Sequence, residues 1–139
     1  MTQPALDNLV RAGQLKVEPR NDAEIARMLA MARTRLNDAQ LGGLSAEGRF
    51  ISAYNAAHGA ALAALRWHGY RSESRYTVFQ CLAHTLQWSA GRWRVLDSAH
   101  RQRNLAEYEG FLEVEESTIA ELCDLVAALI DDVARLTSR

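Results

Sequence analysis

The sequence predicts an all-α fold, an up-and-down helical bundle of four long helices plus one or two short ones. Apolar residues recur at intervals of three or four through most of the chain, and no stretch alternates like a strand. The 139 residues include only 2 Pro, so long helices can form almost without interruption. With no internal repeat and no long linker, residues 1–139 are predicted to form a single domain.

The first part of the chain is predicted to contain a short helix, a loop and a long helix. Proline near the start and glycine after the end favour a short helix over Pro4–Ala12. The segment Lys16–Asn21 contains proline and is predicted to be a loop. Asn21 or Asp22 can cap the long helix, which is predicted to end near Ala39. Its apolar side comprises Ile25, Met28, Leu29, Ala32, Leu36 and Ala39.

The middle of the chain is predicted to form a second long helix and a short one. Ser45 can cap a helix over Ala46–His68, and the glycine that follows is a typical helix end. A polar turn over Tyr70–Arg75 then leads into a short helix over Tyr76–Leu86. The buried side of the long helix is predicted to comprise Phe50, Tyr54, Ala57, Ala61, Ala64 and Leu65.

Two further long helices are predicted in the last third. The fifth helix follows Ser89 as its cap and frays near Gly110, with Trp88 and Trp93 as core anchors or, alternatively, as rings that stack on a base. The helix over Glu115–Thr137 has the clearest pattern, because its apolar residues keep the spacing of a bundle seam. These residues are Ile119, Leu122, Val126, Leu129, Val133 and Leu136.

The net charge of -1 conceals an uneven distribution of charge along the chain. The stretch Arg92–Arg103 contains four arginines and His100 against the single acid Asp97, whereas Glu107–Asp132 contains acidic residues and no basic ones. The overall balance argues against non-specific nucleic-acid binding, which needs a broad basic face. It leaves two alternatives for the basic stretch, a local binding patch or ion pairs with the acidic helix of the same bundle.

The cysteines and the hydropathy pattern indicate a cytoplasmic protein. Cys81 and Cys123 are isolated, and with no secretory signal they are expected to be reduced thiols. No apolar run has the length of a membrane span, so no membrane association is expected. The chain has no phosphate-binding glycine loop, no zinc-ligand spacing and no nucleophile elbow. We therefore expect neither a metal nor a cofactor.

The stretch Leu96–Tyr108 carries the candidate functional residues. Arg103 occupies a seam position in the stripe formed with Leu96, Ala99, Ala106 and Gly110. Burying a guanidinium without partners is very costly, which leaves two interpretations. Arg103 is a structural residue paired with Glu107 or with carbonyl groups, or it faces a cleft or a subunit interface and binds an anion. A polar ridge runs beside this stripe and comprises His100, Asn104 and Tyr108.

Three passages resemble the HEPN superfamily of small helical bundles, which are often encoded beside nucleotidyltransferases in bacteria and archaea. They are FISAYNAAHGAALAALRWHGYRSES, the short helix after it, and RNLAEYEG, and the resemblance covers roughly residues 23–110. The family motif is an arginine, often followed by a polar residue, with a histidine four to six residues further on. Arg103 and Asn104 match its beginning, but Tyr108 stands where the histidine belongs.

The resemblance implies a homodimer that cleaves RNA without metal, as a ribonuclease or toxin component, with a nucleotidyltransferase as a possible partner protein of a toxin–antitoxin pair. Because the motif histidine is absent, catalysis is expected to be weakened or lost. The alternative is a non-catalytic helical dimer that binds a nucleotide, RNA or a partner protein. The catalytic candidates are Arg103, His100 and Tyr108, with His100 as the remaining proton carrier. The candidates for RNA or phosphate binding are Asn104, Arg101 and Asn55.

Overall fold

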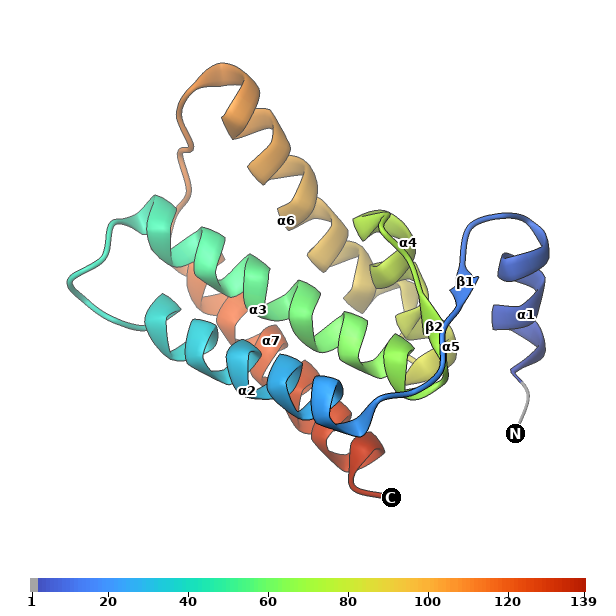
Figure 1. The fold of residues 1–139 in the computed structure, drawn as a ribbon. Coiled ribbons are helices and arrows are strands. Elements are labelled where there is room, and N and C mark those ends of the chain that lie inside the picture. Colours follow the sequence, from blue (N-terminus) through green and yellow to red (C-terminus); the bar gives the residue numbers. More distant parts are fainter. Residues whose placement is uncertain (1–2) are drawn as a thin grey trace.

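The computed structural model describes residues 3–139, and helices account for most of them (Figure 1). The long helices are α2 (Asp22–Ala39), α3 (Ala46–Trp67), α6 (Ala90–Glu109) and α7 (Glu116–Thr137). The short helices are α1 (Pro4–Arg11), α4 (Arg75–Gln80) and α5 (Leu82–Thr85). The prediction of an all-α helical bundle is confirmed, and successive long helices run in opposite directions in Figure 1.

Helices α2, α3 and α7 pack against one another and form the main core. The predicted seam of α7 is confirmed, since all six of its apolar residues are buried. All six residues of the predicted α3 stripe are buried as well. In α3 the contact surface consists largely of small side chains, which allow the neighbouring helices to approach closely. The buried alanines are Ala53, Ala56, Ala57, Ala60, Ala61, Ala63 and Ala64.

The helix ends follow the predicted capping residues with one exception. The side chain of Asn21 accepts a hydrogen bond from the Glu24 N–H at 3.0 Å, and Ser45 accepts one from the Gly48 N–H at 3.0 Å. Ser89 precedes α6 as predicted, but its side chain makes no capping hydrogen bond. Gly110 ends α6 with φ of 85°, a left-handed conformation that glycine adopts at little cost.

Two predicted irregular segments instead pair as short strands. The predicted loop contains β1 (Lys16–Val17) and the predicted turn contains β2 (Tyr70–Arg71), and the two strands are antiparallel. Two residues are too few to show an alternating pattern in the sequence, so periodicity could not reveal this pairing. The Tyr70 side chain is buried, and its hydroxyl donates a hydrogen bond to the Asp7 carboxylate of α1. The strands therefore attach α1 to the end of α3.

The predicted short helix over residues 76–86 is divided in two. Helix α4 begins one residue earlier than predicted, because Ser74 caps it by accepting a hydrogen bond from the Thr77 N–H at 3.3 Å. At Cys81 the chain turns more tightly, and its carbonyl accepts hydrogen bonds from both His84 N–H and Thr85 N–H. This local turn separates α4 from α5 and raises the number of short helices above the predicted one or two in residues 3–139.

A buried arginine at the end of α3 fixes the segment that leads into α2. The Arg66 side chain is 1% exposed. Its Nε lies 3.1 Å from the Glu24 carboxylate, while Nη1 and Nη2 donate hydrogen bonds to the Glu18 and Pro19 carbonyls at 2.9 and 2.8 Å. A guanidinium is suited to this role because its donors point in several fixed directions.

Candidate functional site

Helix α6 carries most of the predicted site residues, and its C-terminal half leans away from the other long helices (Figure 1). The segment 105–111, which we call the α6 tip, exposes three large apolar side chains. Leu105 is 55% exposed, Tyr108 93% and Phe111 57%. Large apolar side chains grouped in this way are typical of a surface that contacts another molecule.

Before the α6 tip, a hydrogen-bonded chain joins three helices and runs from the buried Tyr54 to the exposed Asn104. The hydroxyl of Tyr54 in α3, whose side chain is fully buried, accepts a hydrogen bond from Nη1 of Arg75 in α4 at 3.0 Å. The same hydroxyl lies 3.0 Å from Nδ1 of His100 in α6. On its other side, His100 Nε2 lies 3.2 Å from the Asn104 amide nitrogen. We refer to Tyr54, Arg75, His100, Arg103 and Asn104 as the Tyr54 cluster.

The chemistry of these groups fixes the direction of the hydrogen bonds. Arg75 can only donate, so the Tyr54 oxygen accepts from it. Burial raises the pKa of Tyr54, and its hydroxyl therefore keeps a hydrogen that needs an acceptor. The acceptor within reach among residues 3–139 is His100 Nδ1. Nε2 then carries the hydrogen of the neutral ring, and it can donate to Asn104 only if that side chain presents its amide oxygen in place of the nitrogen that now lies 3.2 Å away.

The two arginines of the cluster approach the Tyr54 ring from different helices. The guanidinium carbon of Arg75 lies 5.5 Å from the centre of the Tyr54 ring, and that of Arg103 lies 5.9 Å from it. Burial lowers the pKa of His100, and the charges of Arg75 and Arg103 lower it further, while Asp97 opposes them. The cluster therefore combines a neutral histidine with two positive charges, an arrangement suited to an anion such as phosphate.

The surroundings of Arg103 agree in part with both interpretations drawn from the sequence, an ion pair with Glu107 and a residue that faces a cleft. Its Nη2 lies 2.9 Å from the Glu107 carboxylate, and its side chain is 29% exposed, so it is paired but not sealed inside the bundle. It also lines a cavity of about 270 Å³ between α3 and the end of α6, together with Glu47 and Ile51. A surface ion pair four residues apart in a helix contributes only about 0.3–0.5 kcal/mol, so a ligand anion can compete with Glu107.

The other predicted site residues lie outside this hydrogen-bonded chain. Arg101 is exposed and lies 3.5 Å from the Asp97 carboxylate, on the preceding turn of α6. Tyr108 follows one turn after Asn104 on the α6 tip, and Asn55 is partly buried in α3. Among residues 3–139, no hydrogen bond or ion pair joins Arg101, Tyr108 or Asn55 to the Tyr54 cluster.

Sequence reasoning missed Tyr54 and Arg75 as site residues. It assigned Tyr54 to the core stripe, where the structure does bury it, and Arg75 to a polar turn. One signal was present in the sequence, because a tyrosine among alanines on a buried stripe needs a partner for its hydroxyl. The identity of that partner depends on how α4 and α6 pack, which a local pattern does not contain.

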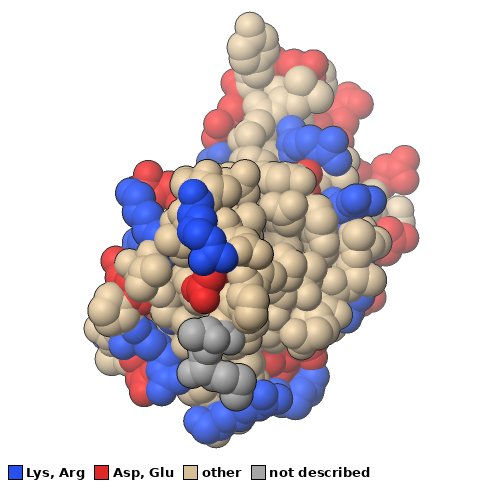
Figure 2. All heavy atoms as spheres, turned by 90° about the vertical axis from the view of Figure 1, so that its right-hand side faces the viewer, with Lys and Arg blue, Asp and Glu red and all other residues tan. Residues whose placement is uncertain are grey.

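The basic stretch of α6 does not pair with the acidic helix α7. In the described part of the chain, Arg101 and Arg103 pair within α6, and the α7 residue Glu116 pairs with Arg49 of α3 at 2.6 Å. Figure 2 shows one face of the molecule, on which basic and acidic side chains are interspersed around a large uncharged area. This face offers no broad basic surface, so any nucleic-acid contact through it would be local.

His58 lies beside the cluster in an unfavourable environment for charge. Its ring packs edge-on against Phe79, with 6.1 Å between ring centres. Burial lowers the pKa of His58 to about 4, and the charges of Arg75 and Arg35 act in the same direction, as does His100 when it is protonated. In the unfolded chain the pKa would return to the ordinary value of 6.5.

This difference predicts a pH dependence of stability. As the pH falls below 6.5, the unfolded chain binds a proton at His58 that the folded protein does not accept until about pH 4. The free energy of unfolding should therefore decrease between these limits. We expect His58→Leu to make this decrease shallower, but not to abolish it, because burial also lowers the pKa of His68 and His100.

Urea unfolding between pH 8 and pH 4.5 measures this effect, with each variant compared with itself at pH 8 so that packing changes cancel. A wild-type slope that His58→Leu leaves unchanged would contradict a neutral, buried His58.

Neither a metal site nor a membrane-spanning helix is found in residues 3–139. No three or more side chains of His, Cys, Asp or Glu lie together in a way that could hold a metal ion. No helix combines the length and the apolar character needed to cross a membrane. In comparisons with known proteins, no family model, no curated protein and no solved structure matches the chain. The resemblance to the HEPN superfamily therefore stays a prediction from the sequence motif.

Proposed function

We propose that the protein is a HEPN-like module that binds RNA phosphates at the Tyr54 cluster and has little or no ribonuclease activity. The observation that carries this proposal is the approach of Arg75 and Arg103 to the ring of Tyr54, whose hydroxyl contacts the neutral His100. Arginine makes two-pronged, charge-assisted hydrogen bonds to phosphate, and a partly exposed Arg103 beside a cavity is available for them.

The same geometry predicts weak catalysis. Metal-independent cleavage needs a group that removes the proton of a ribose 2′-hydroxyl as it attacks the adjacent phosphate. His100 Nδ1 is occupied by Tyr54, and the opposite nitrogen lies next to Asn104, so neither nitrogen is free to accept that proton. Tyr108 is exposed and accessible, but a phenol is a poor base at pH 7.

An RNA-binding and cleavage assay tests the proposed function. We expect a short single-stranded RNA to bind, with an affinity that falls steeply as salt increases, because phosphate contacts release counterions. Cleavage should be absent or slow and insensitive to EDTA. Failure of several RNA sequences to bind at low salt would overturn the proposal.

A gain of activity is predicted for Tyr108→His. This change restores the histidine of the family motif at a four-residue gap after Arg103, in a position where the wild-type side chain is 93% exposed. Since a well-placed acid or base contributes about 10²–10⁴-fold, cleavage of a fluorogenic RNA in EDTA should rise at least about tenfold.

Tyr108→Phe is the control for that gain and should produce none. If instead the wild type cleaves RNA in EDTA, and only Arg103→Ala abolishes this while Tyr108→Phe and His100→Ala do not, another residue carries the proton.

The alternative function is a non-catalytic dimer that binds a partner protein, such as a nucleotidyltransferase. The exposed apolar side chains of the α6 tip favour it, because a surface of this kind suits protein contact. If the protein binds a partner protein and has itself no affinity for RNA, this function is favoured over the first.

Both functions include a homodimer that uses the α6 tip. We expect light scattering to give twice the monomer mass of 15.5 kDa at micromolar concentration. A charge placed in the interface should dissociate the dimer, so Leu105→Glu is expected to yield monomer. Leu41→Glu is the matched control, since Leu41 is 53% exposed but lies between α2 and α3. A monomeric wild type would contradict the prediction.

A further inference from the structure

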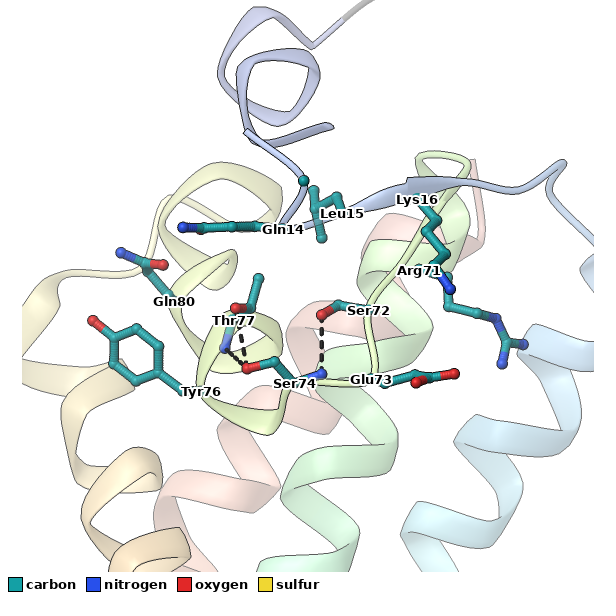
Figure 3. A pocket seen from close by; sticks show the side chains of 11 residues that line it. Gln14, Leu15, Lys16, Arg71, Ser72, Glu73, Ser74, Tyr76, Thr77 and Gln80 are labelled. Atoms are coloured by element: carbon teal, nitrogen blue, oxygen red, sulfur yellow. Dashed lines mark hydrogen bonds between the residues drawn. The ribbon is translucent and has the colours of Figure 1, made fainter. Parts of the chain in front are cut away.

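A second cavity lies on the other side of α4 from the Tyr54 cluster. It has a volume of about 690 Å³ and lies between the α1–β1 connection, the segment from β2 into α4, and α4 itself (Figure 3). This volume falls within the range of about 300–1,000 Å³ that is typical of small-molecule sites. We call it the Lys16 pocket.

The walls of the Lys16 pocket are held in place without a ligand. The pairing of β1 with β2 sets Lys16 opposite Arg71, and Leu15 beside it is only 4% exposed. The capping bond from Thr77 N–H to Ser74 fixes the opposite wall at the start of α4. A preformed pocket binds a small ligand at a lower ordering cost than a flexible loop does.

The two ends of the pocket differ in chemistry. At one end the side chains of Gln14 and Gln80 point to the same side, and the ring of Tyr76 lines the same end of the pocket (Figure 3). Among residues 3–139, no hydrogen bond uses either glutamine amide. Each amide offers both donors and an acceptor, and Tyr76 is 46% exposed. Amide groups and an aromatic ring are the groups that read and stack a nucleobase.

The other end of the pocket carries charge. Arg71 is already neutralised, since it pairs with Glu18 at 2.8 Å and with Glu24 at 3.2 Å. In contrast, neither Lys16 nor Glu73 forms an ion pair within residues 3–139. A lysine is a point charge that suits a phosphate, and a carboxylate can accept hydrogen bonds from ribose hydroxyls.

Between these two ends, Ser72 supplies a further donor. Its hydroxyl oxygen accepts the Ser74 N–H at 3.1 Å, which leaves the hydroxyl hydrogen free for a ligand (Figure 3). From one end to the other, the pocket thus presents two side-chain amides, an aromatic ring, a free hydroxyl hydrogen and one unpaired cation.

We propose that the Lys16 pocket binds a nucleoside monophosphate, with its base at Gln14, Gln80 and Tyr76 and its phosphate at Lys16. The proposal does not rest on the RNA-binding function, because the two sites share no residue. Arg75 of α4 belongs to the Tyr54 cluster, whereas Tyr76, Thr77 and Gln80 of the same helix line the pocket.

Isothermal titration calorimetry with AMP, GMP, CMP and UMP tests the proposal on the full chain. We expect saturable binding of at least one of them with one ligand per chain. The matching nucleoside and ribose 5-phosphate should each bind at least about tenfold more weakly, since each lacks one of the two recognised groups. Inorganic phosphate alone should bind more weakly still.

Variants of the two ends locate the ligand. Lys16→Ala and Gln80→Ala should each weaken binding about tenfold or more, while the control Arg27→Ala, which removes an exposed charge on α2, should not change it. Circular dichroism confirms that each variant is folded. The proposal would be overturned if no nucleotide bound saturably at millimolar concentration. It would also be overturned if Lys16→Ala and Gln80→Ala both bound the nucleotide as tightly as the wild type does.

Arg103→Ala separates this proposal from the proposed RNA-binding function. We expect it to leave nucleotide binding unchanged. If it abolishes nucleotide binding, the nucleotide occupies the Tyr54 cluster and the assignment to the Lys16 pocket is wrong.

Discussion

Replacing Arg66 by methionine is expected to lower the free energy of unfolding by about 3 kcal/mol. The substitution retains most of the side-chain volume but removes three hydrogen bonds, to two carbonyls and the Glu24 carboxylate, and an ion pair with the Glu18 carboxylate at 3.2 Å. Hydrogen bonds from a charged donor contribute about 1.5–3 kcal/mol each, whereas removing a buried guanidinium also relieves its desolvation cost. The net loss is therefore smaller than the sum of the three bonds. Urea unfolding at pH 7 measures it.

Arg71→Met provides a matched control within the same network. Arg71 contacts the same two carboxylates, of Glu18 and Glu24, but its side chain is 40% exposed. Exposed ion pairs contribute about 0–1 kcal/mol, so the control should cost less than 1 kcal/mol. Equal losses in the two variants would show that the carboxylate contacts, and not the buried carbonyl contacts of Arg66, hold the segment before α2.

Arg103→Ala is expected to weaken RNA binding about 10- to 100-fold and to change stability by less than about 0.5 kcal/mol. The binding loss corresponds to charge-assisted hydrogen bonds to phosphate, while the stability loss is limited to an i,i+4 pair with Glu107. The slope of log affinity against log salt should fall by about 1. Fluorescence anisotropy at several salt concentrations and thermal unfolding of the same variant provide both values.

Glu107→Gln is expected to act in the opposite direction, because it removes the carboxylate that competes with phosphate for Arg103. Arg27→Ala, which removes one positive charge from α2, controls for net charge and should have little effect on binding. If Arg103→Ala lowers the melting temperature and leaves RNA binding intact, Arg103 is a structural ion-pair residue and its functional assignment fails.

Most of the fold could be predicted because it follows from local periodicity. In α7 the spacing of Ile119, Leu122 and Val126 identifies the buried side without reference to any other helix, and all three are buried. The same holds for the stripe of α3 and for the caps Asn21 and Ser45. Each of these features depends on residues within one or two turns of one another.

The features that escaped prediction depend on contacts between distant parts of the chain. The pairing of Lys16 with Arg71 joins segments that are separated by all of α2 and α3. In the candidate site, the seam position of Arg103 on α6 was visible in the sequence. In the structure Arg103 lines the cavity between α3 and α6. The hydrogen bonds of Tyr54 to His100 and Arg75 were not visible, since Tyr54 lies 46 residues before His100 and 21 residues before Arg75.

The alanine surface of α3 has a consequence for the entropy of folding. Alanine has no rotamers to lose, so burying Ala53, Ala57 or Ala60 costs no side-chain entropy, whereas burying a longer chain costs up to about 2 kcal/mol. Alanine is also the strongest helix former, which favours helical turns in this segment before the bundle assembles. The centre of this protein can therefore become ordered at low entropic cost, because the alanines at the helix contacts have no rotamer freedom to lose.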